Sequence, residues 1–432
     1  MQVAVIGLGK LGLPFALFLA SRGQQVFCYD KNLKILNQIK KKKSPYIEPL
    51  VDNYLKKFSK NIIIQKNLTN IVKFSKIIHI VLPTPSKKDN SFSNDYIQSC
   101  LKDLSKLLIQ NKNKNTIINI TSTVMPTSCK NVFVKFLQSK GLKNERDFSI
   151  TYNPHFIAQG STIFNLENPD FILIGANDLN GRKLKNYYQK IYKKKNFIEL
   201  MNTTEAEITK ISVNSYITTK ITFSNFISEI CENTEGTDAK KVLDAIGKDH
   251  RIGNKYLGVG TKFSGPCFPR DNKALNFFLK KKIKHSLPLE VDKINNLQTK
   301  RLSQFLFKVI KINRLKKANI GILGLTYKDK TNIIKDSQSY DLIKEINTKN
   351  NLSINVLDHN ITSAKNFTKK YNFNFFKDSK KFLNSSNLLV LMYPSKNFID
   401  ICKNSKSIIV DCWNVINEKS SKSKVYKLGK FF

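Results

Sequence analysis

The heptapeptide GPCFPRD, from Gly265 to Asp271, places a cysteine between two prolines, with a cation and a carboxylate just beyond it. Pro266 and Pro269 disfavour a regular helix or strand around the thiol. We therefore expect Cys267 on a stiff, irregular loop. A thiol in such a place is either a nucleophile or a buried structural cysteine.

A second chemical motif follows the first predicted strand, where VIGLGKLG supplies Gly7, Gly9 and Gly12 ahead of a helical segment. The first glycine permits a tight turn, the second lets the backbone approach a pyrophosphate, and the third lets the helix pack on the strand. Asp30 ends the next predicted strand, where a carboxylate hydrogen-bonds ribose hydroxyls and repels a 2′-phosphate. The pattern predicts an NAD site rather than an NADP site.

Two further polar residues, Lys210 and Asn214, lie on a long predicted helix. The pattern is helical from about residue 203 to 247. This helix starts at a threonine with a glutamate downstream and ends at Gly236. Lys210 and Asn214 are four residues apart, so their side chains project from one face of the helix.

The elements that position these residues alternate along the chain. Strand-like runs lie at 3–9, 24–30, 77–83, 116–122, 148–154 and 171–177, and helical spacing at 12–22, 31–40, 95–110 and 127–140. This rhythm predicts a mostly parallel sheet covered on both faces. After further helix to about residue 313, a second set of strands lies at 318–328, 352–358, 387–393 and 407–413. Its GILGLTYK turn lacks the third glycine, so we expect no second NAD site there.

Composition limits the class of protein. The 432 residues include 73 Lys+Arg and 32 Asp+Glu, for a net charge of +41. The excess is spread along the chain as lysine without a nucleic-acid-binding motif, so we interpret it as a solvated coat. No run is long and apolar enough for a membrane span, and the first residues read as a core strand, so we expect a cytoplasmic protein. Seven scattered cysteines without a CxxC pair argue against disulfides and zinc.

Several segments occur in the order and at the spacing of one enzyme family. They are the N-terminal glycine turn, PTP at 83–85, STV at 122–124, NPHFIAQGS at 153–161, EITKISVNSY at 207–216, RIGNKYL at 251–257, GPCFPRD, and GLTYKDKT at 324–331. On these segments the chain resembles the UDP-glucose/GDP-mannose dehydrogenase family of nucleotide-sugar 6-dehydrogenases, essentially from end to end.

The resemblance implies an oxidoreductase that uses two NAD⁺ to oxidise the C6 alcohol of a nucleotide sugar, with a UDP-hexose favoured, to the uronic acid without releasing the aldehyde. Cys267 then matches the nucleophile that forms a thiohemiacetal and a thioester. Lys210 and Asn214 match the pair that stabilises the developing oxyanion. Asp271 matches the carboxylate that helps to activate water, and Thr123 matches its hydroxyl partner.

The resemblance also implies two sets of ligand-binding residues. The cofactor-binding set is Gly7, Gly9, Gly12, Asp30, Thr84, Thr123, Gln159, Arg270 and Lys335. The substrate-binding set is Phe156, Lys210, Asn214, Arg251, Tyr256 and Lys328, with the arginine supplied by a neighbouring subunit in relatives. Neither set contains a metal site.

The chain departs from the family pattern at positions that matter for hydrolysis. His155 and Gln159 stand where the best-known members have glutamates, the first of which is the proposed general base. Three interpretations remain open. His155 replaces the glutamate as a catalytic base, Asp271 acts alone, or hydrolysis is slow and the activity is altered. In addition, Lys335 replaces an arginine that usually meets the cofactor.

The expected architecture is α/β, with two Rossmann-like α/β domains joined by a central helical dimerisation region. We assign residues 1–200 to an NAD-binding domain, 201–313 to a central helical domain with the catalytic cysteine loop, and 314–432 to a nucleotide-sugar-binding α/β domain. The resemblance implies a homodimer or a higher homo-oligomer, and a role in polysaccharide biosynthesis. Two alternatives stay open: a nucleotide-sugar-binding protein with an altered or lost hydrolysis step, and, from the charge, a nucleic-acid-binding protein.

Overall fold

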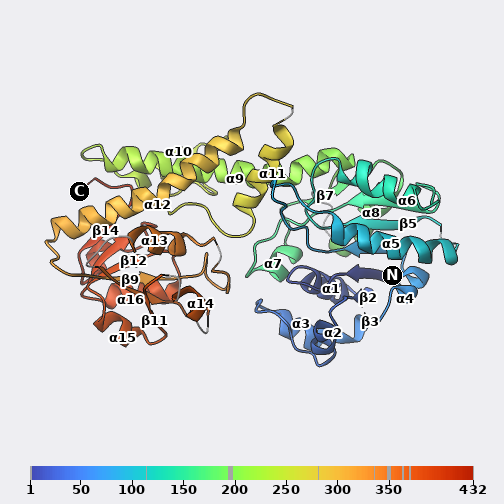
Figure 1. The fold of residues 1–432 in the computed structure, drawn as a ribbon, viewed down its shortest axis with the longest axis horizontal. Coiled ribbons are helices and arrows are strands. Elements are labelled where there is room, and N and C mark those ends of the chain that lie inside the picture. The colour runs from blue at the N-terminus through green and yellow to red at the C-terminus, as the bar shows by residue number, and fades with distance from the viewer. Residues whose placement is uncertain are drawn as a thin grey trace. The chain divides into compact units, whose positions relative to one another are not determined.

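A computed structural model describes residues 2–112, 114–192, 198–280, 282–334, 336–347, 352–361, 364–368 and 371–431. It divides into two compact units, Met1–Val213 and Asn214–Phe432. Figure 1 shows the two units in the colours of the chain, blue to green and green to red. The division into three domains expected from the sequence stays a prediction.

The first unit is built on a sheet with the strand order β3-β2-β1-β4-β5-β6-β7-β8. Its strands are β1 (Gln2–Ile6), β2 (Gln25–Tyr29), β3 (Ile62–Ile64), β4 (Ile77–Ile80), β5 (Thr116–Ile120), β6 (Phe148–Tyr152), β7 (Ile172–Gly175) and β8 (Ile198–Met201). Neighbouring strands are parallel except β6 and β7, which pair antiparallel. The mostly parallel sheet predicted from the alternating pattern is confirmed.

Helices cover both faces of this sheet (Figure 1). They are α1 (Gly12–Ser21), α2 (Leu33–Lys40), α3 (Val51–Phe58), α4 (Thr69–Phe74), α5 (Asp95–Gln110), α6 (Lys135–Gln138), α7 (Thr162–Glu167) and α8 (Asn180–Tyr192), with a 3₁₀ turn η1 (Ser59–Asn61) and a π-helical segment η2 (Cys129–Val134). One buried cluster joins α1 and α8 to Val3 and Val5, and another joins α5 and η2 to Ala4 and Ile6. Alternate residues of β1 thus face opposite helical layers.

The second unit contains a parallel sheet with the order β11-β10-β9-β12-β13-β14. Its strands are β9 (Ala318–Leu323), β10 (Leu352–Leu357), β11 (Asn374–Phe376), β12 (Leu388–Leu391), β13 (Ile408–Asp411) and β14 (Val425–Lys427). Its helices are α10 (Ala239–Lys248), α11 (Phe268–Leu279), α12 (Leu287–Ile312), α13 (Gln338–Ile346), α14 (Lys365–Thr368), α15 (Ser379–Asn384), α16 (Lys396–Asn404) and the 3₁₀ turn η3 (Glu418–Ser420). The long helix α9 (Thr203–Glu232) begins in the first unit and ends in this one.

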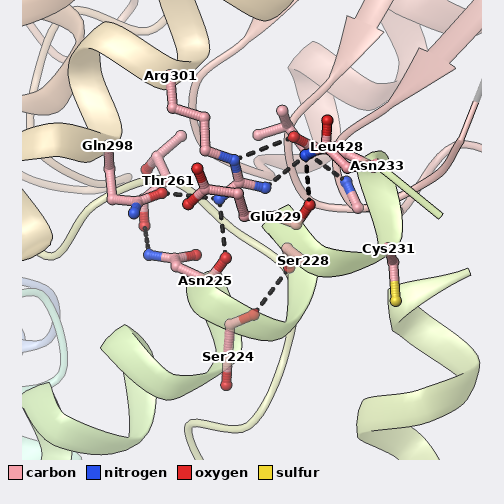
Figure 2. A network of polar contacts seen from close by, with 12 residues as sticks. Ser224, Asn225, Ser228, Glu229, Cys231, Asn233, Thr261, Gln298, Arg301 and Leu428 are labelled. Carbon is pink, nitrogen blue, oxygen red and sulfur yellow. Dashed lines mark hydrogen bonds and ion pairs between the residues drawn. The ribbon is translucent and has the colours of Figure 1, made fainter.

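A buried ion pair fastens the end of α9 inside the second unit. Arg301 of α12 forms a bidentate pair with Glu232, at 2.6 and 3.0 Å. Arg301 also donates to the carbonyl oxygen of Asn225 at 2.9 Å, and Figure 2 labels both of these residues. The same Glu232 carboxylate accepts the backbone N–H of Gly429 at 2.6 Å. Because both side chains of the ion pair are about nine-tenths buried, each charge needs the other. The chain's C-terminal segment is thereby tied to α9 and α12.

Two expectations about helices are corrected. The long helix ends at Glu232 rather than at Gly236, and a separate helix, α10, follows from Ala239. The segment around Cys267 is not wholly irregular, because α11 starts directly after the cysteine with Pro269 in its first turn. Proline is tolerated there because the first helical N–H groups have no partner within the helix.

Within the described residues, no helix combines the length and the apolar character that a membrane span requires.

Candidate active site

The glycine turn of the first unit leaves open space where a ligand could approach. Gly7 adopts a φ of 92°, and its N–H donates to the carbonyl oxygen of Tyr29 at 2.9 Å. A Cβ on Gly12 would lie 1.8 Å from the carbonyl oxygen of Gly7, so only glycine fits there. A Cβ on Gly9 would meet none of the described residues within 4 Å. The turn therefore fits the close approach of a pyrophosphate to the backbone and to the first turn of α1.

Asp30 is held beside this turn by two backbone donors. Its Oδ2 accepts the N–H of Leu8, and its Oδ1 accepts the N–H of Asn32, each at 2.8 Å. Each carboxylate oxygen has a second acceptor site. The carboxylate thus braces the glycine turn and can still accept hydrogen bonds from ribose hydroxyls.

Two hydroxyl residues order the loops after β4 and β5. The hydroxyl of Ser122 accepts the N–H of Leu82 at 2.9 Å and donates to the carbonyl oxygen of Leu82 at 2.6 Å. Thr84, which is 5% exposed, donates to the carbonyl oxygen of Thr123 at 2.7 Å. Thr84 and Thr123 therefore lie together at the carboxyl edge of the sheet, where ligands of such folds bind.

The loop that carries His155 is joined to α9 by Lys210. The Lys210 ammonium donates to the carbonyl oxygen of His155 at 2.9 Å and lies 4.4 Å from the ring centre of Phe156. Lys210 is 8% exposed, so its charge is largely desolvated. Gln159, on the same loop, is half-buried.

The imidazole of His155 is packed against an aromatic ring. It meets Phe15 of α1 edge-on, with the ring centres 4.4 Å apart. Its buried Nδ1 has no hydrogen-bond partner among the described residues. Burial, and then the nearby Lys210 charge, lower the pKa of His155 to about 3. The ring is therefore neutral near pH 7 but a weak base, which does not favour it as the replacement for a catalytic glutamate.

In the second unit, Cys267 lies at the start of α11. It is exposed, whereas the other six cysteines are buried. The backbone N–H of Asp271 donates to the carbonyl oxygen of Cys267 at 2.9 Å, which closes the first helical turn. Positive partial charge at this end of a helix favours an anion such as a thiolate.

Asp271 is held by α9. It is 4% exposed, and its Oδ2 accepts the Nδ2–H of Asn214 at 2.6 Å. The next residue, Asn272, is fully buried and joins the hydroxyl of Thr218 at 3.1 Å to the carboxylate of Asp292 at 3.0 Å. The structure thus brings together Asn214, Asp271 and the cysteine turn.

The loop before Cys267 admits no side chain at Gly265. Its φ is 83°, and a Cβ there would lie 2.5 Å from the ring of Tyr327. Lys328 follows Tyr327 directly, with its ammonium 5.6 Å from that ring centre. The GLTYKDKT segment and the cysteine loop are therefore neighbours in the second unit.

The remaining predicted site residues have different settings. Arg251 is exposed and pairs with Asp249 at 2.6 Å, and Tyr256 is 51% exposed with a φ of 61°. Arg270 is half-buried on α11. Lys335 lies outside the described residues.

Sequence reasoning missed residues whose partners are distant in the chain. Phe15 was read only as part of a helix. Glu48 accepts the N–H groups of Gly160 at 3.0 Å and Thr162 at 2.9 Å, and so orders the loop that follows His155. No local periodicity marks such a carboxylate.

Comparison with known proteins identifies one family, whose three domain models match successive parts of the chain. Models of the UDP-glucose/GDP-mannose dehydrogenase family match residues 1–196 as the NAD binding domain, 204–297 as the central domain and 321–418 as the UDP binding domain.

Individual relatives agree with this match. A UDP-glucose 6-dehydrogenase of Rickettsia bellii is 29% identical over 95% of this chain and 88% of its own length. A putative UDP-glucose 6-dehydrogenase of Bacillus subtilis is 30% identical over 80% of this chain and 79% of its own length. The structure of a UDP-glucose dehydrogenase from Pyrobaculum islandicum has the same fold, with a TM-score of 0.86 and 22% identity, and the match covers 100% of this chain and 98% of that one.

The lowered pKa values of His79 and His155 predict a loss of stability in acid. His79, fully buried on β4, also has its pKa lowered to about 3 by burial, then by His155. The unfolded chain binds protons below about pH 6.5 while the folded chain does not, so stability is complete above that pH and falls as the pH is lowered.

We expect His155→Phe to reduce the pH slope of the free energy of unfolding by up to about 1.4 kcal/mol per pH unit between pH 5.5 and 4.5. Urea unfolding followed by far-ultraviolet circular dichroism measures it. His250→Phe, at an exposed histidine, is the control and should leave the slope unchanged. Equal slopes in the wild type and His155→Phe would contradict the account.

Proposed function

Because the chain belongs to the UDP-glucose/GDP-mannose dehydrogenase family, we propose that it oxidises the C6 alcohol of a nucleotide sugar to the acid through a covalent intermediate on Cys267. The chain is an NAD-dependent oxidoreductase of this family. The observation that carries the covalent route is the exposed Cys267 thiol at the start of α11, one turn before the buried Asp271 held by Asn214.

Atoms and electrons balance at each step of the proposed route. The Gly7–Gly12 turn would hold the pyrophosphate of NAD⁺, and two molecules of NAD⁺ per acid would supply the hydride acceptors for two successive rounds of two-electron oxidation. The first round converts the C6 alcohol to an aldehyde, with release of the hydroxyl proton. The Cys267 thiolate then adds to the aldehyde carbon, and the second round converts this adduct to a thioester. Water cleaves the thioester, which restores the thiol and yields the acid.

We assign charge stabilisation to Lys210 and Asn214. An ammonium and an amide N–H stabilise an oxyanion best when they are fixed before the charge develops. Lys210 is fixed by the carbonyl oxygen of His155, and Asn214 by the carboxylate of Asp271. These contacts support the assignment, because they hold both donors in place without a substrate.

For the hydrolysis step we favour Asp271 over His155 as the group that activates water. A pKa near 3 leaves His155 a poor proton acceptor, and its ring packs on Phe15. Asp271 is a carboxylate one helical turn from the thiol. Loss of the hydrolysis step, which would leave a nucleotide-sugar-binding protein, is not favoured because Cys267, Lys210, Asn214 and Asp271 are all retained.

We infer a UDP-sugar as the favoured substrate. The model matched by residues 321–418 describes a UDP binding domain, and several relatives are UDP-glucose 6-dehydrogenases, although one is a GDP-mannose 6-dehydrogenase of Pseudomonas syringae. Phe156, Tyr256 and Lys328 stay assigned to the substrate, and Thr84, Thr123, Gln159, Arg270 and Lys335 to the cofactor. A cytoplasmic location and a role in polysaccharide biosynthesis stay predictions.

We also infer a homodimer. In the second unit, α9 exposes large apolar side chains at helical spacing: Tyr216 at 66%, Phe223 at 43%, Phe226 at 52% and Ile230 at 46%. Such a row on one helix is typical of an interface with another protein surface. Arg251, exposed and paired only with its neighbour Asp249 among the contacts described, suits a role in the partner subunit's site.

The oxidation itself is tested with purified protein and a panel of UDP- and GDP-sugars. We expect two NADH for each acid formed, because no aldehyde is released. Cys267→Ser should form less than about 1% of the acid at the same enzyme concentration, since the alkoxide of serine is a far weaker nucleophile near neutral pH. No NADH with any member of the panel would contradict the proposal, and so would acid formation by Cys267→Ser at the wild-type rate.

Hybrid dimers test whether Arg251 acts across an interface. Arg251→Ala and Cys267→Ser should each be inactive alone. After dissociation and random reassociation of equal amounts, about a quarter of the sites should combine an intact Arg251 with an intact Cys267 and regain activity. Recovery of activity supports the shared site, whereas its absence, with hybrids demonstrated by native mass spectrometry, places Arg251 in its own subunit's site.

A further inference from the structure

Glu207 is a buried carboxylate to which the proposed reaction assigns no role. It lies on α9, one turn before Lys210, and is fully buried. Its Oε2 accepts the backbone N–H of Thr127 at 2.6 Å, and its Oε1 accepts that of Cys129 at 2.8 Å. Both donors lie far from Glu207 in sequence, Thr127 by 80 positions and Cys129 by 78. The carboxylate therefore binds the segment that leads into η2 rather than its own helix.

The turn held by Glu207 is strained. Thr127 has a φ of 75°, in the left-handed region that a β-branched residue rarely adopts. Two backbone hydrogen bonds surround it, from Ser128 N–H to the carbonyl oxygen of Met125 at 3.1 Å and from Asn131 N–H to that of Thr127 at 2.8 Å. A conformation of this kind persists only where the surroundings enforce it. The two hydrogen bonds to Glu207 supply that enforcement.

This turn directly continues the loop assigned to the cofactor. Val124 is fully buried, and the preceding Thr123 offers its carbonyl oxygen to the hydroxyl of Thr84. Ser122 is fixed in turn by both backbone groups of Leu82. A shift at residues 125–129 would therefore be passed to Thr123 through a short, buried stretch of chain.

The electrostatics of Glu207 fit a group that depends on these two donors. Burial raises the pKa of its carboxyl to about 7, while the hydrogen bonds from Cys129 and Thr127 oppose the rise. Loss of either donor would leave a buried acceptor without a partner.

We propose that Glu207 is a positioning residue that holds the strained Met125–Cys129 turn and thereby fixes Thr123 for the cofactor. The link to the cofactor rests on the proposed function, in which Thr123 and Thr84 line the NAD site. Glu207 itself touches neither cofactor nor substrate in this account. It acts through the backbone of the turn.

A double-mutant cycle tests this role with Glu207→Gln and Thr127→Gly in the full-length protein. The glutamine side chain keeps its size but turns an amide N–H toward one of the two backbone donors. Glycine adopts a positive φ without strain, so the turn with Thr127→Gly should no longer need Glu207. Glu229→Gln, at an exposed carboxylate of the same helix, is the control.

Two readouts are measured for each protein: the Kd for NAD⁺ and the hydrogen exchange of the backbone amides of residues 125–134. We expect Glu207→Gln to raise the Kd at least fivefold and to speed exchange in this segment. In the Thr127→Gly background the same change should raise the Kd less than twofold. The control should match the wild type in both readouts.

The opposite results overturn the proposal. They are an equal loss of affinity in both backgrounds, or no change in either readout with Glu207→Gln. If Glu207→Gln alone does not fold, folding of the double variant supports the proposal, and failure of both contradicts it. Hydrogen exchange needs no ligand, so it decides on Glu207 even if the wild type fails to bind NAD⁺, a result that would instead contradict the cofactor assignment.

Discussion

The hydrogen bond from Asn214 to Asp271 is the constraint on which the proposed chemistry depends. At 2.6 Å, it joins α9 to the first turn of α11, and the N–H of Asp271 in turn holds the carbonyl oxygen of Cys267. Asn272, the adjacent residue, repeats the connection through Thr218 and Asp292. The place of the thiol is thus set by side chains of two long helices, and the loop before it needs only to pass Tyr327 without a Cβ at Gly265.

The two units use one structural device with different outcomes. In the first unit, Asp30 directly follows β2 and accepts the N–H of Leu8, in the turn after β1. In the second unit, Asp358 directly follows β10 and accepts the N–H of Leu325, in the turn after β9. Asp358 is fully buried and also accepts from Thr326 and Tyr393. A Cβ on Gly324 would lie 2.3 Å from the ring of Tyr393. Asp30, by contrast, is only half-buried. Gly7 is equally crowded, with a Cβ 2.3 Å from the carbonyl oxygen of Val81, so the units differ two residues later: a Cβ on Gly9 would meet none of the described atoms within 4 Å, whereas the second unit has Thr326 there, bonded to Asp358.

Local sequence rules predicted much of this arrangement. The demands on Gly7 and Gly12 follow from backbone sterics over a few residues, and the parallel sheets follow from the alternation of strands and helices. The rules failed at Cys267, where Pro269 was taken to oppose a helix but in fact lies in the first turn of α11. They could not predict the roles of Glu48 and Glu207, because the backbone partners of these carboxylates are distant in sequence. Thr162 lies 114 positions from Glu48, and Cys129 lies 78 positions from Glu207. The weak basicity of His155 also depends on packing, because it results from burial beside Phe15 and Lys210.

The most direct test of the covalent route uses the Asp271→Asn variant. If Asp271 activates water, this variant should still load Cys267 but hydrolyse the thioester slowly. After brief incubation with NAD⁺ and the preferred nucleotide sugar and an acid quench, mass spectrometry of the peptide with Cys267 should show the mass of the bound acyl group. We expect a substantial fraction of the peptide to carry this mass in the variant, and much less in the wild type. Acid formation by the variant at the wild-type rate, or a stalled variant whose Cys267 stays unmodified, would contradict the account.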